Sequence, residues 1–294
     1  MTRTEAPSGL VIVDKPGGLT SHGVVSRMRR LAGTRRVGHA GTLDPMATGV
    51  LIIGVEKATR LLGHLALTEK EYEATIRLGQ TTVTDDAEGE VTATVSAAGV
   101  TREAVDAGIA ALTGPIRQVP SKVSAIKVNG VRSYTRVREG EDFELPARPV
   151  TVSAFTVGDV RHEGDAVDLD VTVVCSSGTY IRALARDLGA GLGVGGHLTA
   201  LRRTRVGPYG LDGAHTLDQL EESFAVLPIE QAAAAAFPRW DVDAEQARLL
   251  GHGVRIKAPA LAPGPNAVFG PGGRFLALVE EKQGQTKIVA GFAP

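Results

Sequence analysis

Apolar positions along this chain follow two spacings. Residues 71–78 alternate apolar and charged side chains, which predicts a strand whose Tyr72 faces the core. Residues 167–174 alternate in the same way. Residues 148–157 form another predicted strand, which a polar turn joins to the strand at residues 167–174. Two uninterrupted apolar runs, residues 9–13 and 49–55, predict short buried strands.

Helices are predicted where apolar residues recur every three or four positions after a capping residue. Thr20 or Ser21 begins the first, and Thr101 begins one that stops at Gly114. A third carries Thr179 as its cap and Gly189 as its stop. Further helical segments are predicted for residues 57–67, from Thr216, around residues 232–236, and from Asp243 to Leu250.

The pattern of the C-terminal region differs from that of the rest of the chain. Short predicted strands at residues 267–269, 274–279 and 286–289 are separated by Pro-Gly-Gly and Gln-Gly turns, which is typical of a small all-β domain. An Asn129-Gly130 pair between strand-like flanks predicts a hairpin. The pattern divides the chain into a disordered tail at 1–8, a main domain at 9–235 and an all-β domain at 240–294.

Composition and charge limit the kinds of function that this protein can have. The 294 residues carry a net charge of -1, so any nucleic-acid site must be a local patch, with basic clusters at residues 27–36, 122–138 and 202–205. The lone Cys175 lies in an apolar run and is predicted to be a buried thiol. Scattered histidines and an acidic stretch at residues 84–90, interpreted as a solvated turn, give no metal-ligand spacing. Without a signal peptide or membrane-length apolar run, the chain is expected in the cytoplasm.

The central stretch, residues 38–49, gathers three glycines and a proline around one acid, Asp44. This composition predicts a loop that a ligand can approach closely. Two interpretations remain open from spacing alone. Asp44 either caps a helix that begins at Pro45, or it is a functional carboxylate.

The string GHAGTLDPMATGVL resembles the motif that carries the catalytic aspartate in the TruB family of tRNA pseudouridine-55 synthases. Three further strings, DKPGGLTS, KEYEATIRLG and CSSGTYIRALARDLG, resemble the family's other motifs. The resemblance covers roughly residues 9–210. It implies an α+β fold with a mixed, mainly antiparallel sheet flanked by helices, an RNA-gripping insertion at about 115–150, and a PUA-like C-terminal domain that binds RNA.

The same resemblance implies a set of site residues. Asp44 is the expected catalytic nucleophile, Tyr72 stacks on the base or acts as general base, and Arg182 pairs with Asp44. Arg182 also falls in the first turn of its predicted helix, where a guanidinium opposes the helix dipole, so it is expected to serve a partner. Further substrate contacts are expected from Tyr180, which helps enclose the base, from His39, which fills the space that a flipped base leaves, and from Lys15, Gly41, Thr42, Leu43, Arg202 and Arg203.

The implied reaction converts a uridine of the tRNA T-arm to pseudouridine with no net redox change and no energy input. We therefore expect no nicotinamide, ATP or other cofactor, and no metal. The carboxylate attacks the sugar C1′, adds to the base C6, or removes a C2′ proton, and these alternatives stay open. We expect a monomer that binds tRNA and no membrane. Two rival functions are a tRNA-binding or folding factor without essential catalysis, and a synthase that modifies another RNA in a guide complex.

Overall fold

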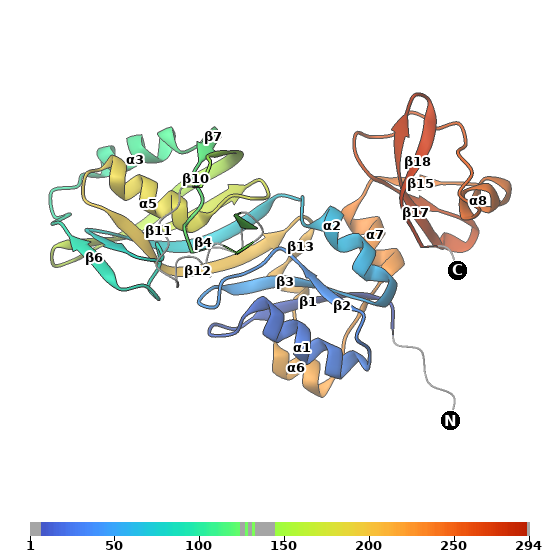
Figure 1. The fold of residues 1–294 in the computed structure, drawn as a ribbon, viewed down its shortest axis with the longest axis horizontal. Helices are drawn as coiled ribbons and strands as arrows, with labels where there is room; N and C mark the ends of the chain where they lie inside the picture. The colour runs from blue at the N-terminus through green and yellow to red at the C-terminus, as the bar shows by residue number, and fades with distance from the viewer. Residues whose placement is uncertain (1–6, 124–126, 129–130, 133–144, 293–294) are drawn as a thin grey trace. The chain divides into compact units, whose positions relative to one another are not determined.

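A computed structural model describes residues 7–123, 127–128, 131–132 and 145–292, and these fall into two compact units. The first unit holds the chain up to Pro45, Gly49–Thr68 and the chain from Val206 onward. The second holds Met46–Thr48 and Glu69–Arg205 (Figure 1). Most of the predicted tail, the Asn129-Gly130 turn and most of the predicted insertion lie outside the described residues.

The N-terminal part of the first unit is a small antiparallel sheet with a helix. Strand β1 (Gly9–Lys15) pairs with β3 (Thr48–Val55) on one edge and with β14 (Leu227–Pro228) on the other. Strand β2 (Val37–Ala40) pairs with β3. Helix α1 (Ser21–Ala32) is capped by Thr20, whose hydroxyl accepts from the Gly23 amide. The first predicted helix is therefore confirmed, and Ser21 is not its cap.

Short helices complete this unit. The single helix predicted for residues 57–67 is wrong in form: a 3-10 helix, η1 (Glu56–Leu61), precedes α2 (Leu62–Leu65). The Thr59 hydroxyl donates to the Glu56 carbonyl, which favours the tighter turn. Strand β13 (Tyr209–Gly210) and η2 (Leu211–Gly213) lead into α6 (Leu217–Glu222), which begins with a capping box from Thr216, and α7 (Ile229–Ala236) follows.

The C-terminal segment forms a four-stranded sheet, which agrees with the predicted strands. Strand β15 (Arg239–Asp241) runs parallel to β16 (Asn266–Phe269), and β17 (Phe275–Lys282) and β18 (Gln285–Gly291) continue antiparallel. Helix α8 (Ala244–Gly251) begins at the predicted Asp243 capping box, and η3 (Pro271–Gly273) forms a turn.

This sheet does not have a wholly separate core. Phe269, Phe275 and Phe292 belong to the same buried cluster as Leu10 and Leu61 of the N-terminal segment. Arg60 also donates to the Gly291 carbonyl at 2.5 Å. The boundary between the predicted domains at 9–235 and 240–294 stays a prediction, because packing groups both ends of the chain in one unit.

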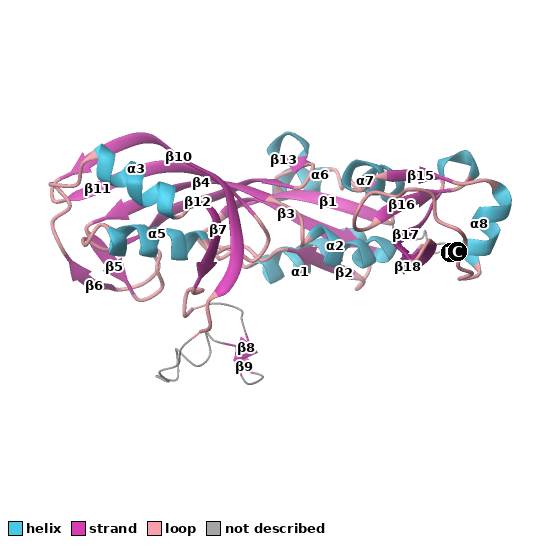
Figure 2. Cartoon of the chain, turned by 90° about the horizontal axis from the view of Figure 1, so that it is seen from above, coloured by secondary structure: helices cyan, strands magenta, loops and turns pink. Residues whose placement is uncertain are grey.

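The second unit is built on a sheet with the order β12 (Gly196–Val206), β4 (Lys70–Leu78), β11 (Ala166–Cys175), β10 (Arg148–Glu163) and β7 (Gly114–Gln118). From β4 to β7 the pairing is antiparallel. Helices α3 (Arg102–Ala111) and α5 (Ile181–Gly191) pack on each other and against β10 and β4. Two further pairs of short strands are antiparallel: β5 (Gln80–Thr82) with β6 (Val91–Thr94), and β8 (Lys127–Val128) with β9 (Val131–Arg132) (Figure 2).

Two helix boundaries differ from the sequence prediction. Thr179 does not cap α5, because its hydroxyl donates to the Ser176 carbonyl and the cap residue is Tyr180. Helix α5 also continues past Gly189 to Gly191. Helix α3, in contrast, agrees with its prediction, because Thr101 caps it and it ends at Ala111, before Gly114. Across the described residues, none of the helices has the length and apolar character needed to cross a membrane.

Gly189 has no side chain, and this allows α5 to pack closely against the start of β12. We therefore predict that a side chain at this position destabilises the protein. A Cβ at Gly189 would lie 2.2 Å from the backbone carbon of Gly195, so Gly189→Ala should destabilise the fold by about 1–3 kcal/mol. Gly191 ends the same helix, and a Cβ there would point into open space, so Gly191→Ala should be neutral or stabilising by ~0.4–1 kcal/mol. Denaturant unfolding of both variants checks this, and equal stabilities would contradict the close approach.

Candidate active site

Asp44 lies in the connection of a β-hairpin. Residues 38–40 of the predicted loop belong to β2, and Gly49 belongs to β3, so the loop itself spans residues 41–47. Gly41 and Gly49 have φ values of 73° and 99°, a conformation that favours glycine. The chain passes from Pro45 into β3 without a helix, so the interpretation of Asp44 as a helix cap is wrong. Asp44 is half-buried.

Residues of the segment 14–21 hold this loop by donating hydrogen bonds to the backbone carbonyl of Pro45. Lys15 is fully buried at the end of β1, and its ammonium donates to the carbonyls of Pro16 (2.9 Å), Leu19 (2.7 Å) and Pro45 (3.2 Å). The Gly18 amide donates to the same Pro45 carbonyl at 2.8 Å. The sequence predicts a substrate contact for Lys15, whereas these bonds fix the residue that follows Asp44.

The residue that precedes Asp44 is held as well. The Ser21 hydroxyl accepts from the Leu43 amide at 2.8 Å and donates to the Leu43 carbonyl at 3.0 Å. Ser21 and Leu43 are both buried, whereas Thr42 is exposed. His39 is half-buried on β2, opposite Ile53 of β3. The substrate contacts expected of His39, Gly41, Thr42 and Leu43 stay predictions.

Arg182 is built into the second unit by several contacts. Only 4% of the residue is exposed, and its Nη1 lies 3.3 Å from Oδ2 of Asp86, which is 2% exposed. Nη1 also donates to the Thr84 carbonyl at 2.8 Å, and Nη2 donates to the Val123 carbonyl at 2.9 Å. The prediction that residues 84–90 form a solvated turn is therefore wrong for Asp86, which the Thr84 hydroxyl also binds.

A second ion pair joins the same turn to α5. Arg186 lies one helical turn after Arg182, with Nη1 3.4 Å from Oδ2 of Asp85 and Nη2 donating to the Val119 carbonyl at 2.7 Å. Burial raises the pKa of Asp85, and the Ser121 hydroxyl and the guanidinium of Arg186 partly oppose that rise. Both arginines thus tie α5 to the turn at residues 84–86 and to the segment that follows β7.

The two tyrosines of the predicted site occupy different elements of this unit. Tyr72 is 7% exposed and lies opposite Val173 of β11, so its predicted inward orientation is confirmed. Tyr180 precedes α5, and its backbone is bound on both sides by the Gln118 side chain. The Tyr180 amide donates to Oε1 at 2.8 Å, and Nε2 donates to the Tyr180 carbonyl at 3.0 Å. The base contacts of both tyrosines stay predictions.

Sequence reasoning missed Asp86, Ser21 and Gln118. Asp86 had one available signal: Arg182 has no dipole reason to be in the first turn of α5, and a buried acid explains why it is there. The pattern indicates only a helix cap for Ser21. Gln118 shows no local pattern, because its partner lies 62 residues away in sequence.

The predicted basic clusters are partly neutralised within the protein. Arg27 and Arg30 pair with Glu221, and Arg36 pairs with Glu56. Arg203 is only 1% exposed, so its placement does not support the predicted phosphate contact.

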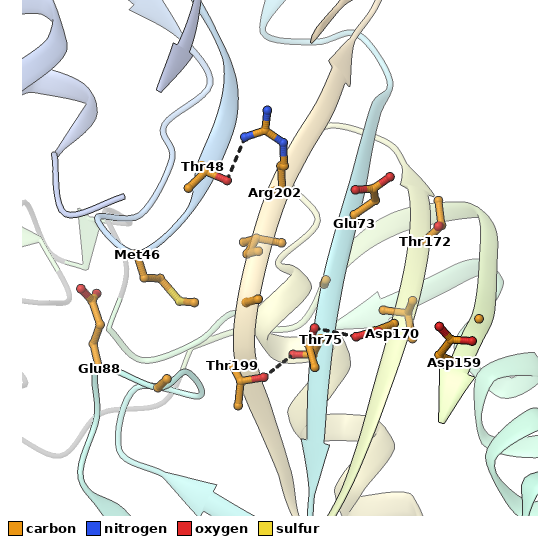
Figure 3. Close-up of a pocket in the computed structure, with 16 residues that line it drawn as sticks. Met46, Thr48, Glu73, Thr75, Glu88, Asp159, Asp170, Thr172, Thr199 and Arg202 are labelled. Atoms are coloured by element: carbon orange, nitrogen blue, oxygen red, sulfur yellow. Dashed lines mark hydrogen bonds between the residues drawn. The ribbon is translucent and has the colours of Figure 1, made fainter. Parts of the chain in front are cut away.

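Arg202 borders an open groove of about 760 Å³ and donates to the Thr48 hydroxyl at 3.2 Å (Figure 3). Four carboxylates line the same groove, so it is unsuited to phosphate as a whole; they belong to Glu73, Glu88, Asp159 and Asp170. The predicted RNA contact of Arg202 stays a prediction.

Two buried ionisable groups stand at strand ends, Lys70 at the start of β4 and Cys175 at the end of β11. Cys175 is 1% exposed, as predicted, and burial raises its pKa to about 11, which disfavours the nucleophilic thiolate. Burial, with a smaller contribution from Arg203, lowers the pKa of Lys70 to about 8. Within the described ranges, His, Cys, Asp and Glu side chains do not gather in groups of three or more suited to a metal ion.

The structure therefore assembles the predicted site in two parts. Lys15 and the Asp44 loop belong to the first unit, and Tyr72, Tyr180 and Arg182 belong to the second. Each part is held by buried polar contacts. The pairing of Arg182 with Asp44 stays a prediction.

The fold is that of pseudouridine synthases, a mainly antiparallel sheet with helices and a small C-terminal β domain. A solved Cbf5-Nop10-Gar1 complex aligns with a TM-score of 0.71 and 28% identity over 99% of this chain and 85% of that chain. An H/ACA RNP bound to a substrate RNA containing 2′-deoxyuridine aligns with a TM-score of 0.71 and 26% identity, over 97% of this chain and 85% of that chain.

Sequence comparison identifies the family. Residues 29–181 match the N-terminal domain of TruB family pseudouridylate synthases, residues 182–234 match the tRNA pseudouridylate synthase B C-terminal domain, and residues 237–293 match the C-terminal domain of tRNA pseudouridine synthase II. The tRNA pseudouridine synthase B of Streptomyces griseus is 70% identical, over 99% of both chains. This chain belongs to the TruB family of pseudouridylate synthases.

Proposed function

We propose that this chain is an isomerase that converts a uridine of tRNA to pseudouridine, and that the target is uridine 55 in the T-loop. The observation that carries this proposal is the Asp44 loop. Its only acid lies between two residues, Leu43 and Pro45, that buried groups hold by their backbones. The 70% identity to a relative named tRNA pseudouridine synthase B supports tRNA as the substrate.

Asp44, Tyr72 and Arg182 have different roles in the proposed reaction. Asp44 assists departure of the base from the sugar, and Tyr72 is placed to stack on the base or to take the C5 proton afterwards. Arg182, anchored by Asp86, orients the Asp44 carboxylate. The target uridine must leave its stack, at a cost of a few kcal/mol, before it can meet these groups. Isomerisation conserves atoms and electrons, so the reaction needs no redox cofactor.

The decisive experiment uses the purified chain alone. We expect it to form pseudouridine in an unmodified tRNA transcript, and to form none in a matched transcript that carries cytidine at position 55. Activity without an added guide RNA or partner protein would exclude the function in a guide complex, and turnover of the transcript would exclude a purely binding or folding role. Absence of product in the first transcript would overturn the proposal.

We further propose that the enzyme acts as a monomer in the cytoplasm.

Salt dependence tests whether the basic clusters contact RNA. Affinity for tRNA should fall steeply with salt despite the net charge of -1, because each phosphate contact releases counterions. Replacing exposed Arg35 by alanine should reduce the log–log slope by about 1. Arg102 pairs with Asp106 on α3, outside the clusters, so Arg102→Ala should leave the slope unchanged. A flat salt response in titrations would show that the clusters are only solvated surface.

A further inference from the structure

Ser21 is positioned for a task other than starting helix α1. Thr20 already provides the cap, and the Ser21 side chain turns to the Asp44 loop, 22 residues away in sequence. A hydroxyl is both a donor and an acceptor, and Ser21 uses both functions on the same residue, Leu43. Both residues are buried, so water does not readily replace these bonds.

The two bonds define the backbone on the N-terminal side of Asp44. The Leu43 carbonyl shares a planar peptide unit with the Asp44 amide, so a bond to that carbonyl orients the plane from which the Asp44 side chain projects. On the other side, the ring of Pro45 fixes φ, and bonds from Gly18 and Lys15 to its carbonyl hold ψ. A residue before proline is itself restricted to extended conformations. The carboxylate then moves mainly by its own side-chain rotations.

We propose that Ser21 is a positioning residue for catalysis, which acts by fixing the Leu43–Asp44 peptide and thereby the direction of the Asp44 carboxylate. This inference rests on the proposed function of Asp44. Ser21 does not touch the reacting atoms. Its effect is therefore on the chemical step, and tRNA binding is largely independent of it.

The test compares Ser21→Ala with Thr20→Ala in the full chain. Both changes remove a hydroxyl from the start of α1. Only Ser21→Ala removes the hydrogen bonds to Leu43, whereas Thr20→Ala removes the helix cap. Ser21→Ala should reduce the single-turnover rate on tRNA transcript by about 100-fold, the size expected for a misplacement of about 1 Å, with the tRNA Kd within about 3-fold. Thr20→Ala should lower the melting temperature, with the rate within about 2-fold of wild type.

Hydrogen exchange provides a readout that does not depend on activity. The Leu43 amide should be protected in the wild type and in Thr20→Ala, and should exchange at least about 10-fold faster in Ser21→Ala, while the amides that pair β2 with β3 stay protected. A wild-type rate for Ser21→Ala, or equal rate losses in both variants, would overturn the proposal. If Asp44→Asn kept its turnover, the role of Asp44 on which this inference rests would fail, and if the wild-type chain formed no product, the proposed function itself would fail; both outcomes are distinct from the result for Ser21→Ala.

Discussion

Asp44→Asn should abolish pseudouridine formation and leave tRNA affinity within a few-fold of wild type. The change is nearly isosteric, so the bonds that hold Leu43 and Pro45 are retained, and only the negative charge and the nucleophilic oxygen are lost. Single-turnover assays at saturating enzyme measure the chemical step, and filter binding measures affinity.

Asp218→Asn is a suitable control, because Asp218 is an exposed acid in the first turn of α6. It should have wild-type turnover and wild-type affinity. Turnover close to wild type in Asp44→Asn would remove Asp44 from the mechanism. Loss of affinity in parallel with loss of turnover would instead indicate that the loop serves mainly to bind RNA.

Substitutions of Arg182 should reduce the single-turnover rate in the order wild type, Arg182→Lys, Arg182→Ala, with a much smaller change in tRNA affinity. The guanidinium presents several donors in one plane, and it uses them on the Asp86 carboxylate and on the carbonyls of Thr84 and Val123. A lysine ammonium keeps the charge but cannot reproduce this geometry. If Arg182→Ala weakened RNA binding as much as it slowed the chemistry, Arg182 would be a phosphate contact and its pairing with Asp44 would be wrong.

The buried pair with Asp86 complicates the alanine variant and also provides its control. Removing Arg182 alone leaves a buried carboxylate uncompensated, typically at a cost of about 3–5 kcal/mol of stability. Combining Arg182→Ala with Asp86→Asn removes that charge. We expect the double variant to recover much of the stability without recovering the rate. Recovery of both would mean that Arg182 serves the fold and has no role in the chemistry.

The fold is predictable where local patterns decide it. The alternation around Tyr72, the Asp243 capping box and the C-terminal strands all occur in the structure, because burial of one face or satisfaction of a helix end requires only neighbouring residues. The segment predicted as one helix at residues 57–67 is helical but begins as a 3-10 helix, in which the Thr59 hydroxyl binds the Glu56 carbonyl.

The site is predictable at the level of motifs and not of contacts. Asp44 and Arg182 are assigned to the candidate site through their surroundings in sequence, and their roles stay predictions. The sequence predicts a solvated turn around Asp86. Charge alone does not reveal that Asp86 forms a buried ion pair with Arg182, which lies 96 positions later. The resemblance implies a substrate contact for Lys15, which stays a prediction, and the sequence does not reveal that its ammonium binds three backbone carbonyls.

The shared core of the two chain ends has a consequence for synthesis on the ribosome. Domains usually fold as they emerge, N-terminal first. Here Leu10 of β1 and Leu61 of η1 belong to the same buried cluster as Phe275 and Phe292, so the N-terminal part of the first unit cannot complete its packing until the last strands have been made. Glu69–Arg205, by contrast, is one continuous segment that makes up nearly all of the second unit. The middle of the chain should therefore fold first, and a nascent enzyme should remain inactive until translation is nearly complete.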